Sequence, residues 1–271
     1  MGKHLGVSAD ILSSTLINHR KSGLLALLAA GTALTASPAL AQAQPENDGL
    51  ADIVVTATRS AESLSKVAAS ISAVSEEALG AGGIKDVASL SSAIPNLSVG
   101  DQFGVNRIFI RGIGMTSIDL GADGGVAFLQ DGAQVARPAA QLSGFYDLER
   151  VEVLRGPQGT LYGRSATAGA INLITKRPTA ELEGYARGTY GNYNAVALEG
   201  AVGGPISGDK LMVRVAGKYD RRDGYGINQF TGKDIDNRDA YAFRGTLLAK
   251  PSDDVEILLS GEYFHENDSN Y

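Results

Sequence analysis

The sequence predicts an α+β domain followed by antiparallel transmembrane β-strands of an incomplete β-barrel. Three observations predict this fold class: an N-terminal export signal, mixed helix and strand patterns up to Pro178, and a two-residue alternation after Pro178. Eight of the ten tyrosines lie from Tyr185 onward, where the helical period disappears. The 271 residues are 44% hydrophobic and 20% charged, which is the composition of a folded chain.

Residues 1–41 are predicted to be a signal peptide. Arg20 and Lys21 precede an apolar run over residues 23–36, and a small-x-small cleavage site follows, ending at Ala41. The apolar run is shorter than the ~20 residues that cross a bilayer as a helix. The alternative is a buried helix. Cleavage would change the net charge from −6 to −8.

The composition excludes several classes of function. The chain has no cysteine, and two of its three histidines, His4 and His19, lie in the signal peptide. Thiolate sites, multi-histidine metal sites and a cysteine nucleophile are therefore excluded, and a Ser-His-Asp triad would need His265. We expect no enzyme, no cofactor and no metal site. The acidic net charge argues against binding to nucleic acid.

Residues 42–59 are predicted to form a tether that faces the periplasm. Residues 42–50 are polar and include Pro45 and Gly49, which favours a flexible chain. The β-branched run over residues 52–59 can stay extended and donate a strand to the sheet of another protein. The alternative is that this run is the first strand of the domain.

Residues 60–178 show the mixed pattern of an α+β domain. Ile84, Val87, Leu90 and Ile94 share one helical face, which predicts a helix over residues 83–94 that ends before Pro95. Strands are predicted at residues 107–111, 126–130, 150–154 and 170–175, separated by glycine-rich turns.

Residues 179–271 are predicted to be five strands, starting near residues 182, 193, 210, 239 and 254. The period of two, strand lengths near ten and aromatic residues near strand ends are typical of transmembrane β-strands. A soluble β-sandwich shows the same alternation. The export signal and the absence of cysteine favour the outer membrane of a Gram-negative cell.

Five stretches resemble the TonB-dependent receptors of Gram-negative outer membranes. Residues 52–59, DIVVTATR, resemble the TonB box, and residues 148–163, LERVEVLRGPQGTLYG, give the strongest match. The other stretches are RIFIRG at residues 107–112, FLQDG at 128–132 and AGAINLITK at 168–176.

The resemblance implies a plug domain that fills a barrel of about 22 strands. Such receptors import scarce ligands, most often ferric siderophores, with energy from the inner-membrane TonB, ExbB and ExbD proteins. The resemblance assigns TonB binding to Asp52, Ile53, Val54, Val55, Thr56, Ala57 and Thr58. It also implies that Arg111 and Arg155 of the plug form ion pairs with glutamates of the barrel.

The chain departs from the family in its length. Only 93 residues follow Pro178, and five strands cannot close a barrel around a plug. We therefore expect an N-terminal fragment that does not transport by itself. Two other functions remain open: a passive porin-like channel, and a soluble periplasmic plug or binding module. The identity of the ligand does not follow from the sequence.

Overall fold

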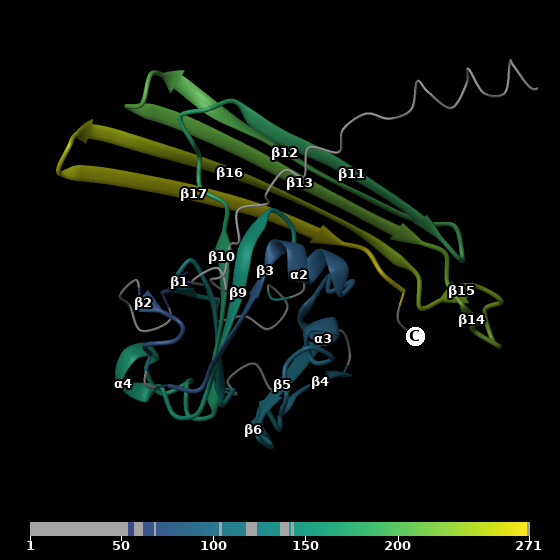
Figure 1. Cartoon of the computed structure of the whole chain (residues 1–271). Helices are drawn as coiled ribbons and strands as arrows, with labels where there is room; N and C mark the ends of the chain where they lie inside the picture. The colour runs from purple at the N-terminus through teal and green to yellow at the C-terminus, as the bar shows by residue number, and fades with distance from the viewer. Residues whose placement is uncertain are drawn as a thin grey trace, which may run out of the picture. The chain divides into compact units, whose positions relative to one another are not determined.

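The computed structural model describes residues 54–56, 62–67, 69–102, 105–117, 124–135, 141 and 144–269. These residues form an α+β domain, which ends with strand β10 (Gly169–Thr175), and a separate sheet of long strands that begins at β11 (Glu183–Gly191). We call this second sheet the long-stranded sheet. Figure 1 shows it as five extended strands coloured from green to yellow.

The α+β domain is built on a five-stranded sheet in the order β3-β9-β10-β7-β8. Only β7 and β10 pair in parallel; the other neighbours are antiparallel. The remaining strands of this sheet are β3 (Ile71–Ser75), β7 (Val126–Gln130), β8 (Ala133–Gln134) and β9 (Leu148–Arg155). The strands predicted near residues 126, 150 and 170 are therefore confirmed.

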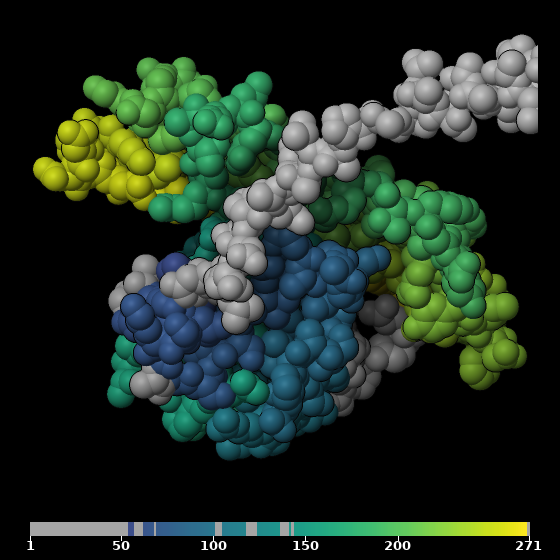
Figure 2. All heavy atoms as spheres, viewed as in Figure 1, coloured from purple at the N-terminus to yellow at the C-terminus, as the bar shows by residue number. Residues whose placement is uncertain are grey.

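The main core of the domain lies on one face of this sheet. Val151 and Val153 of β9 pack there with residues from β5 and from two of the three described helices; the third, α4 (Gly159–Tyr162), contributes none. The two helices that contribute are α2 (Glu76–Ala81) and α3 (Val87–Leu90), and β5 (Val105–Ile110) lies in a second sheet with β4 (Leu97–Gln102) and β6 (Ile113–Gly114). In Figure 2 the blue atoms of this part of the chain form one continuous surface.

The helix predicted over residues 83–94 is much shorter in the structure. The side chain of Asp86 accepts a hydrogen bond from the Ser89 N–H, and the Ser89 hydroxyl accepts one from the Asp86 N–H, so this capping box starts α3 at Val87. The hydroxyls of Ser91 and Ser92 donate back to carbonyls one turn earlier, at the end of the helix. The four apolar residues are nevertheless buried, as their spacing predicts.

The long-stranded sheet is an antiparallel meander in the order β11-β12-β13-β16-β17. Its other strands are β12 (Ala195–Ser207), β13 (Leu211–Arg222), β16 (Arg238–Ser252) and β17 (Val255–Glu266). All five starts lie close to the predicted positions. A short hairpin, β14 (Gly226–Ile227) with β15 (Asp234–Ile235), interrupts the connection from β13 to β16 and was not predicted.

In this sheet the exposed face is apolar and the covered face carries charged residues, which is the reverse of the pattern in a soluble protein. Val215, Phe243 and Leu259 are between 50% and 61% exposed, whereas their strand neighbours Arg214 and Arg244 are buried. Strands normally place successive side chains on opposite faces. One face is therefore apolar and exposed, and the other is polar and covered. Among the described residues, no helix is long and apolar enough to cross a membrane.

Aromatic rings gather on the exposed face at one end of β16 and β17. The ring of Tyr241 lies 5.9 Å from that of Phe243, 6.0 Å from that of Tyr263 and 5.1 Å from that of His265. Tyr219 of β13 is paired with Tyr241 in the register of the sheet. Aromatic residues in this position are typical of the girdle where a membrane strand meets the interface.

Candidate functional site

The segment Val54–Thr56 is docked on the α+β domain. Strand β1 (Val54–Val55) pairs antiparallel with β2 (Glu62–Ser63), and the side chain of Val55 is completely buried. The Thr56 N–H donates to Glu152 Oε1 at 2.9 Å, and the Thr56 hydroxyl donates to the same oxygen at 3.3 Å. Three of the seven predicted TonB-binding residues, Val54, Val55 and Thr56, are thus held against the sheet.

The other four predicted TonB-binding residues, Asp52, Ile53, Ala57 and Thr58, lie outside the described residues. Within the described residues, Val54 and Val55 pair with β2 of the same chain, which is the alternative that the sequence left open, a first strand of the domain. Their assignment as a binding segment for TonB therefore stays a prediction.

Glu152 is a carboxylate in the middle of the sheet. It lies on the inner strand β9, between Ala73 of β3 and Asn172 of β10, and is 0% exposed. Arg150, two residues earlier on the same face, donates from Nε to Glu152 Oε1 at 2.8 Å and from Nη2 to the Thr56 hydroxyl at 3.3 Å. The second oxygen, Oε2, is buried without a hydrogen-bond partner among the described residues.

Arg111 and Arg155 lie near one another at the opposite end of β9. Arg111 sits at a φ of +54° in the turn between β5 and β6, and its Nη1 lies 3.8 Å from the position that a Cβ on Gly156 would occupy. The Nε of Arg155 is buried without a hydrogen-bond partner, and no carboxylate of a described residue forms an ion pair with either arginine. The predicted pairing with barrel glutamates therefore stays a prediction.

A different residue, Asp147, joins the α+β domain to the long-stranded sheet. Arg214 of β13 donates from Nε and Nη2 to the two oxygens of Asp147, at 2.8 and 2.6 Å. The side chains are 3% and 1% exposed. Such two-point pairing fixes the orientation of both groups. Asp147 has a φ of +48°, a conformation that aspartate tolerates better than most residues.

Arg244 of β16 makes a second connection at the same place. Its Nη2 donates to the carbonyl oxygens of Tyr146 and Asp147, at 2.9 and 3.0 Å, and its guanidinium lies 4.5 Å from the centre of the Tyr146 ring. Burial, together with the charge of Glu262, raises the pKa of Tyr146 well above its usual range. The phenol is therefore neutral at physiological pH.

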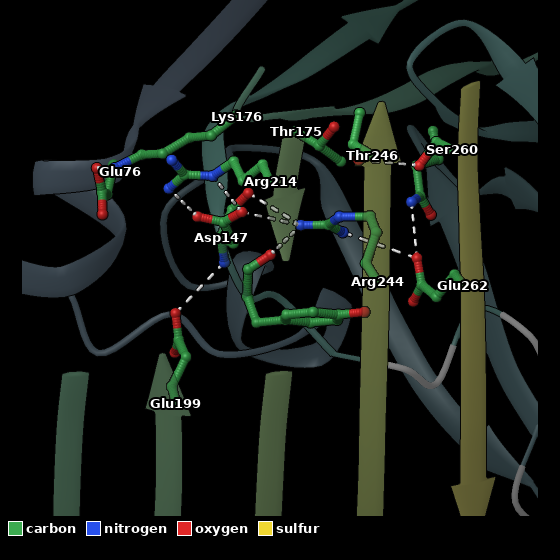
Figure 3. Close-up of polar contacts among 12 residues, drawn as sticks. Glu76, Asp147, Thr175, Lys176, Glu199, Arg214, Arg244, Thr246, Ser260 and Glu262 are labelled. Carbon is green, nitrogen blue, oxygen red and sulfur yellow. Dashed lines mark hydrogen bonds and ion pairs between the residues drawn. The ribbon is translucent and has the colours of Figure 1, made fainter. Parts of the chain in front are cut away.

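Carboxylates of the long-stranded sheet contact this cluster, and Figure 3 shows Glu199 beside Asp147 and Glu262 beside Arg244. Glu183 accepts from Arg214 Nη1 at 2.7 Å, Glu262 Oε2 lies 3.7 Å from Arg244 Nη1, and Glu199 accepts from the Asp147 N–H at 3.3 Å. Small residues leave room for the Tyr146 ring, which packs against Ala201, Ala216 and Ala242. We call Asp147, Arg214 and Arg244 the anchor.

The sequence did contain a signal for the anchor. Arg214 and Arg244 both occupy the phase of their strands opposite to the apolar residues, so the alternation places them on the same covered face. Their partner, Asp147, stands directly before the strongest motif of the chain and carries no signal of its own. Only the three-dimensional structure brings these residues together across 67 and 97 positions of the chain.

A cavity of about 620 Å³ lies between the docked segment, the α+β domain and the long-stranded sheet. Thr56 and Arg150 line it on one side, and Thr246 and Ser260 line it on the other. A second cavity, of about 360 Å³, lies beside the anchor and includes Asp147 and Glu199 in its lining. Both cavities therefore border the contacts described above.

Comparison with known proteins identifies the α+β domain. The model of the family described as "TonB-dependent Receptor Plug Domain" matches residues 63–170. Residues 63–170 are a TonB-dependent receptor plug domain. The resemblance seen in the motifs is confirmed, and so is the predicted fold class, a plug domain followed by antiparallel strands. From here on the α+β domain is called the plug domain.

The similar proteins of known name are receptors and transporters. The chain is 32% identical over 201 residues to the pesticin receptor of Yersinia pestis, a match that covers 73% of this chain and 29% of the receptor. It is 32% identical over 162 residues to the vitamin B12 transporter of Vibrio vulnificus, covering 57% of this chain and 25% of the transporter.

Solved structures show the same architecture. The ferric yersiniabactin uptake receptor from Yersinia pestis matches with a TM-score of 0.66 and 28% identity, covering 72% of this chain and 31% of that one. The ferripyoverdine receptor of the outer membrane of Pseudomonas aeruginosa matches with a TM-score of 0.65 and 22% identity, covering 79% and 27%. At that identity the second match shows the fold alone.

The chain spans less than a third of the length of these relatives. An iron-regulated outer membrane virulence protein of Vibrio cholerae is also similar, with 31% identity over 185 residues covering 63% of this chain and 28% of that protein. Both the similarity to outer-membrane receptors and the exposed apolar face of the long-stranded sheet indicate the outer membrane. The protein is an outer-membrane protein.

Proposed function

We propose that this chain belongs to a receptor that imports a scarce ligand, most favourably a ferric siderophore, across the outer membrane. In this proposal residues 1–41 are a signal peptide, residues 42–59 a tether with the TonB box, residues 60–178 the plug domain and residues 179–271 strands of the barrel wall. TonB, with ExbB and ExbD, supplies energy through the box, and outer-membrane lipid surrounds the strands. No enzymatic activity is proposed.

One observation carries the proposal: the plug domain is covalently joined to a sheet that holds it by a buried charged contact on one face and exposes apolar residues on the other. The anchor fixes the plug to the covered face at 2.6–2.8 Å. The exposed face suits hydrocarbon, as in the wall of a membrane barrel. A domain held in this way can close a pore and still leave its N-terminal segment accessible from the periplasm.

The similar proteins favour an iron complex as the ligand, but they also include a transporter for a ligand of another kind. The named relatives include receptors for ferric yersiniabactin and ferripyoverdine, and a vitamin B12 transporter. A ferric siderophore and a cobalamin are both too scarce and too large for passive diffusion. The ligand is therefore to be tested among iron chelates first and cobalamin second.

Deletion of residues 52–58 from the complete gene tests the proposal. The host is an iron-starved Gram-negative strain that lacks its own siderophore receptors, and the probes are radioactive-iron complexes of yersiniabactin and pyoverdine, with labelled cobalamin as a third probe. We expect the deletion to abolish uptake while binding of the probe to whole cells persists, because the segment transmits energy and does not contact the ligand.

Three outcomes would favour a rival function or contradict the proposal. Uptake that is unchanged by the deletion would favour a passive porin-like channel, which has no use for the box. Recovery of the protein in the soluble periplasmic fraction would favour a free plug or binding module. Uptake that survives in a strain without TonB would contradict the proposal even if the deletion reduced uptake.

A further inference from the structure

We infer that Glu152, Arg150 and Thr56 form a latch that keeps the box docked on the plug domain and that opens while the anchor stays closed. The inference rests on the proposed function for its purpose, because a latch matters only if something pulls on the box. Its evidence is independent and lies in the contacts of three side chains. Glu152 and Arg150 are positioning residues in this account.

The latch concentrates its contacts on one buried oxygen. Glu152 Oε1 accepts from the Thr56 N–H, the Thr56 hydroxyl and Arg150 Nε, at 2.9, 3.3 and 2.8 Å. The Thr56 hydroxyl also accepts from Arg150 Nη2, which closes a ring of three side chains. Hydrogen bonds to a charged group are stronger than neutral ones. The backbone pairing of β1 with β2 adds only a two-residue ladder.

The latch is built to open at moderate cost. Glu152 Oε2 is buried without a partner among the described residues, so half of the carboxylate is poorly solvated while the box is docked. Departure of Thr56 lets water reach both oxygens, since Thr56 and Arg150 already line the cavity of about 620 Å³. Arg150 keeps a carboxylate partner throughout, because it also pairs with Glu149.

The anchor has more of its polar atoms in hydrogen bonds than the latch has, and its plug residue, Asp147, directly precedes the strand that carries Glu152. Asp147 uses both carboxylate oxygens, its N–H and its carbonyl oxygen in hydrogen bonds. It precedes Glu152 by five residues, a separation of roughly 16 Å along an extended strand. Force on the box acts directly on the contact between Thr56 and Glu152, whereas the anchor holds a different segment of the plug domain, at Asp147. The weaker contact therefore yields before the plug leaves the sheet.

A buried cysteine reports whether the latch is open. These 271 residues contain no cysteine, so Val55→Cys introduces the sole thiol within them, at a side chain that is 0% exposed when docked. The rate of modification by a bulky maleimide then follows the population of the undocked state. The measurement uses the complete gene product in detergent micelles and needs neither TonB nor a ligand.

Glu152→Gln is the test variant and Glu149→Gln its matched control. Both remove a carboxylate that pairs with Arg150 from the same strand, but only Glu152 contacts Thr56. We expect Glu152→Gln to accelerate the labelling of Val55→Cys on the order of tenfold, and Glu149→Gln to leave the rate nearly unchanged. Thr56→Val, which removes only the hydroxyl, is expected to accelerate it severalfold and carries the test if Glu152→Gln does not fold.

A second reporter shows that the anchor stays closed. Ala216→Cys places the thiol against the Tyr146 ring, where Ala216 is 2% exposed. Its labelling should stay slow in Glu152→Gln and become fast only in Asp147→Asn. Equal labelling of Val55→Cys in the Glu152 and Glu149 variants would overturn the latch, and so would joint acceleration of both reporters. A receptor that fails to transport can still pass this test, so the two proposals fail separately.

Discussion

At the scale of single residues, the carboxylate of Asp147 is the buried counter-charge at the centre of the connection between plug and sheet. Asp147 neutralises part of the charge of two arginines whose side chains are each 3% exposed. Removing one member of a buried charge network costs far more than the network contributes as a whole, because the remaining charges stay buried. Substitution of Asp147 is therefore expected to lower the stability of the protein strongly, although Asp147 belongs to none of the sequence motifs.

Asp147→Asn is expected to destabilise the protein by about 3–5 kcal/mol, because Arg214 and Arg244 lose a buried counter-charge. Glu183→Gln is the matched control: Glu183 also pairs with Arg214, but its side chain is 48% exposed, so we expect a loss of less than about 1 kcal/mol. Equilibrium unfolding in guanidinium, followed in detergent, measures both. Equal losses in the two variants would show that the anchor is not a buried charge pair in solution.

At the scale of elements, the long-stranded sheet exposes its apolar side chains and covers its charged ones, whereas a soluble sheet does the reverse. On β13 and β16 the exposed residues Val215 and Phe243 alternate with the buried residues Arg214 and Arg244, which contact the plug domain. A soluble sandwich would bury the first set and expose the second. The ambiguity that alternation alone left between a sandwich and membrane strands is therefore resolved by which set is covered.

Leu259→Lys tests this orientation. At the middle of a membrane strand we expect the lysine to cost about 2–4 kcal/mol, and Val255→Lys, on the same face near the start of β17, to cost about 0–1 kcal/mol. The measurement is equilibrium folding of the complete gene product into phosphatidylcholine vesicles. A solvent-exposed face would tolerate both lysines equally, and that outcome would contradict a lipid-facing sheet.

Much of the fold could be predicted from the sequence because local patterns encode it. Three of the five long strands, β13, β16 and β17, show a clear alternation in the sequence, and the starts of all five lie within a few residues of the predicted positions. The helix over residues 83–94 was predicted too long, because the capping box at Asp86 and the serines after Leu90 act more strongly than the apolar spacing. The β14–β15 hairpin is only two residues deep on each side and has no periodic signal.

The candidate site could be predicted only in part. The β-branched box and the motif around Glu152 are visible in the sequence, but their contact joins residues 96 positions apart. The sequence alone leaves open whether the box is free or is a first strand of the domain, whereas Val54–Thr56 are docked in the structure. Arg111 and Arg155 were chosen through the resemblance, and the anchor was missed, because pairing between a plug and a strand is decided by tertiary structure and not by local pattern.

At the scale of the whole molecule, the proposal requires the chain to be exported before it folds. The exposed apolar face and the docked segment Val54–Thr56 both fit a protein that lies in the outer membrane, with one side open to the periplasm. The signal peptide proposed over residues 1–41 supplies the route. The cargo, in contrast, is set by parts of the receptor that contact the ligand, and relatives with the same architecture differ in it.

Processing at Ala41 gives a direct test at this scale. We expect mass spectrometry of the protein from outer membranes to find Gln42 as the first residue, because the small residues Ala39 and Ala41 suit signal peptidase. Ala41→Leu should block this processing and leave the longer chain at the inner membrane, whereas Ala43→Leu, beyond the site, should not. An unprocessed N-terminus in the mature outer membrane would contradict the assignment.

The complete burial of Val55 has a consequence for any protein that seeks the box. A partner can bind only the fraction of molecules in which the box is undocked, so its apparent affinity is the intrinsic affinity scaled down by that fraction. If docking is favoured by about 1.4 kcal/mol, recruitment of the partner weakens roughly tenfold. A receptor in which bound ligand shifted the equilibrium toward the undocked box would bind the partner more tightly than empty receptors do. It would therefore compete better for a partner that is present in limited amount.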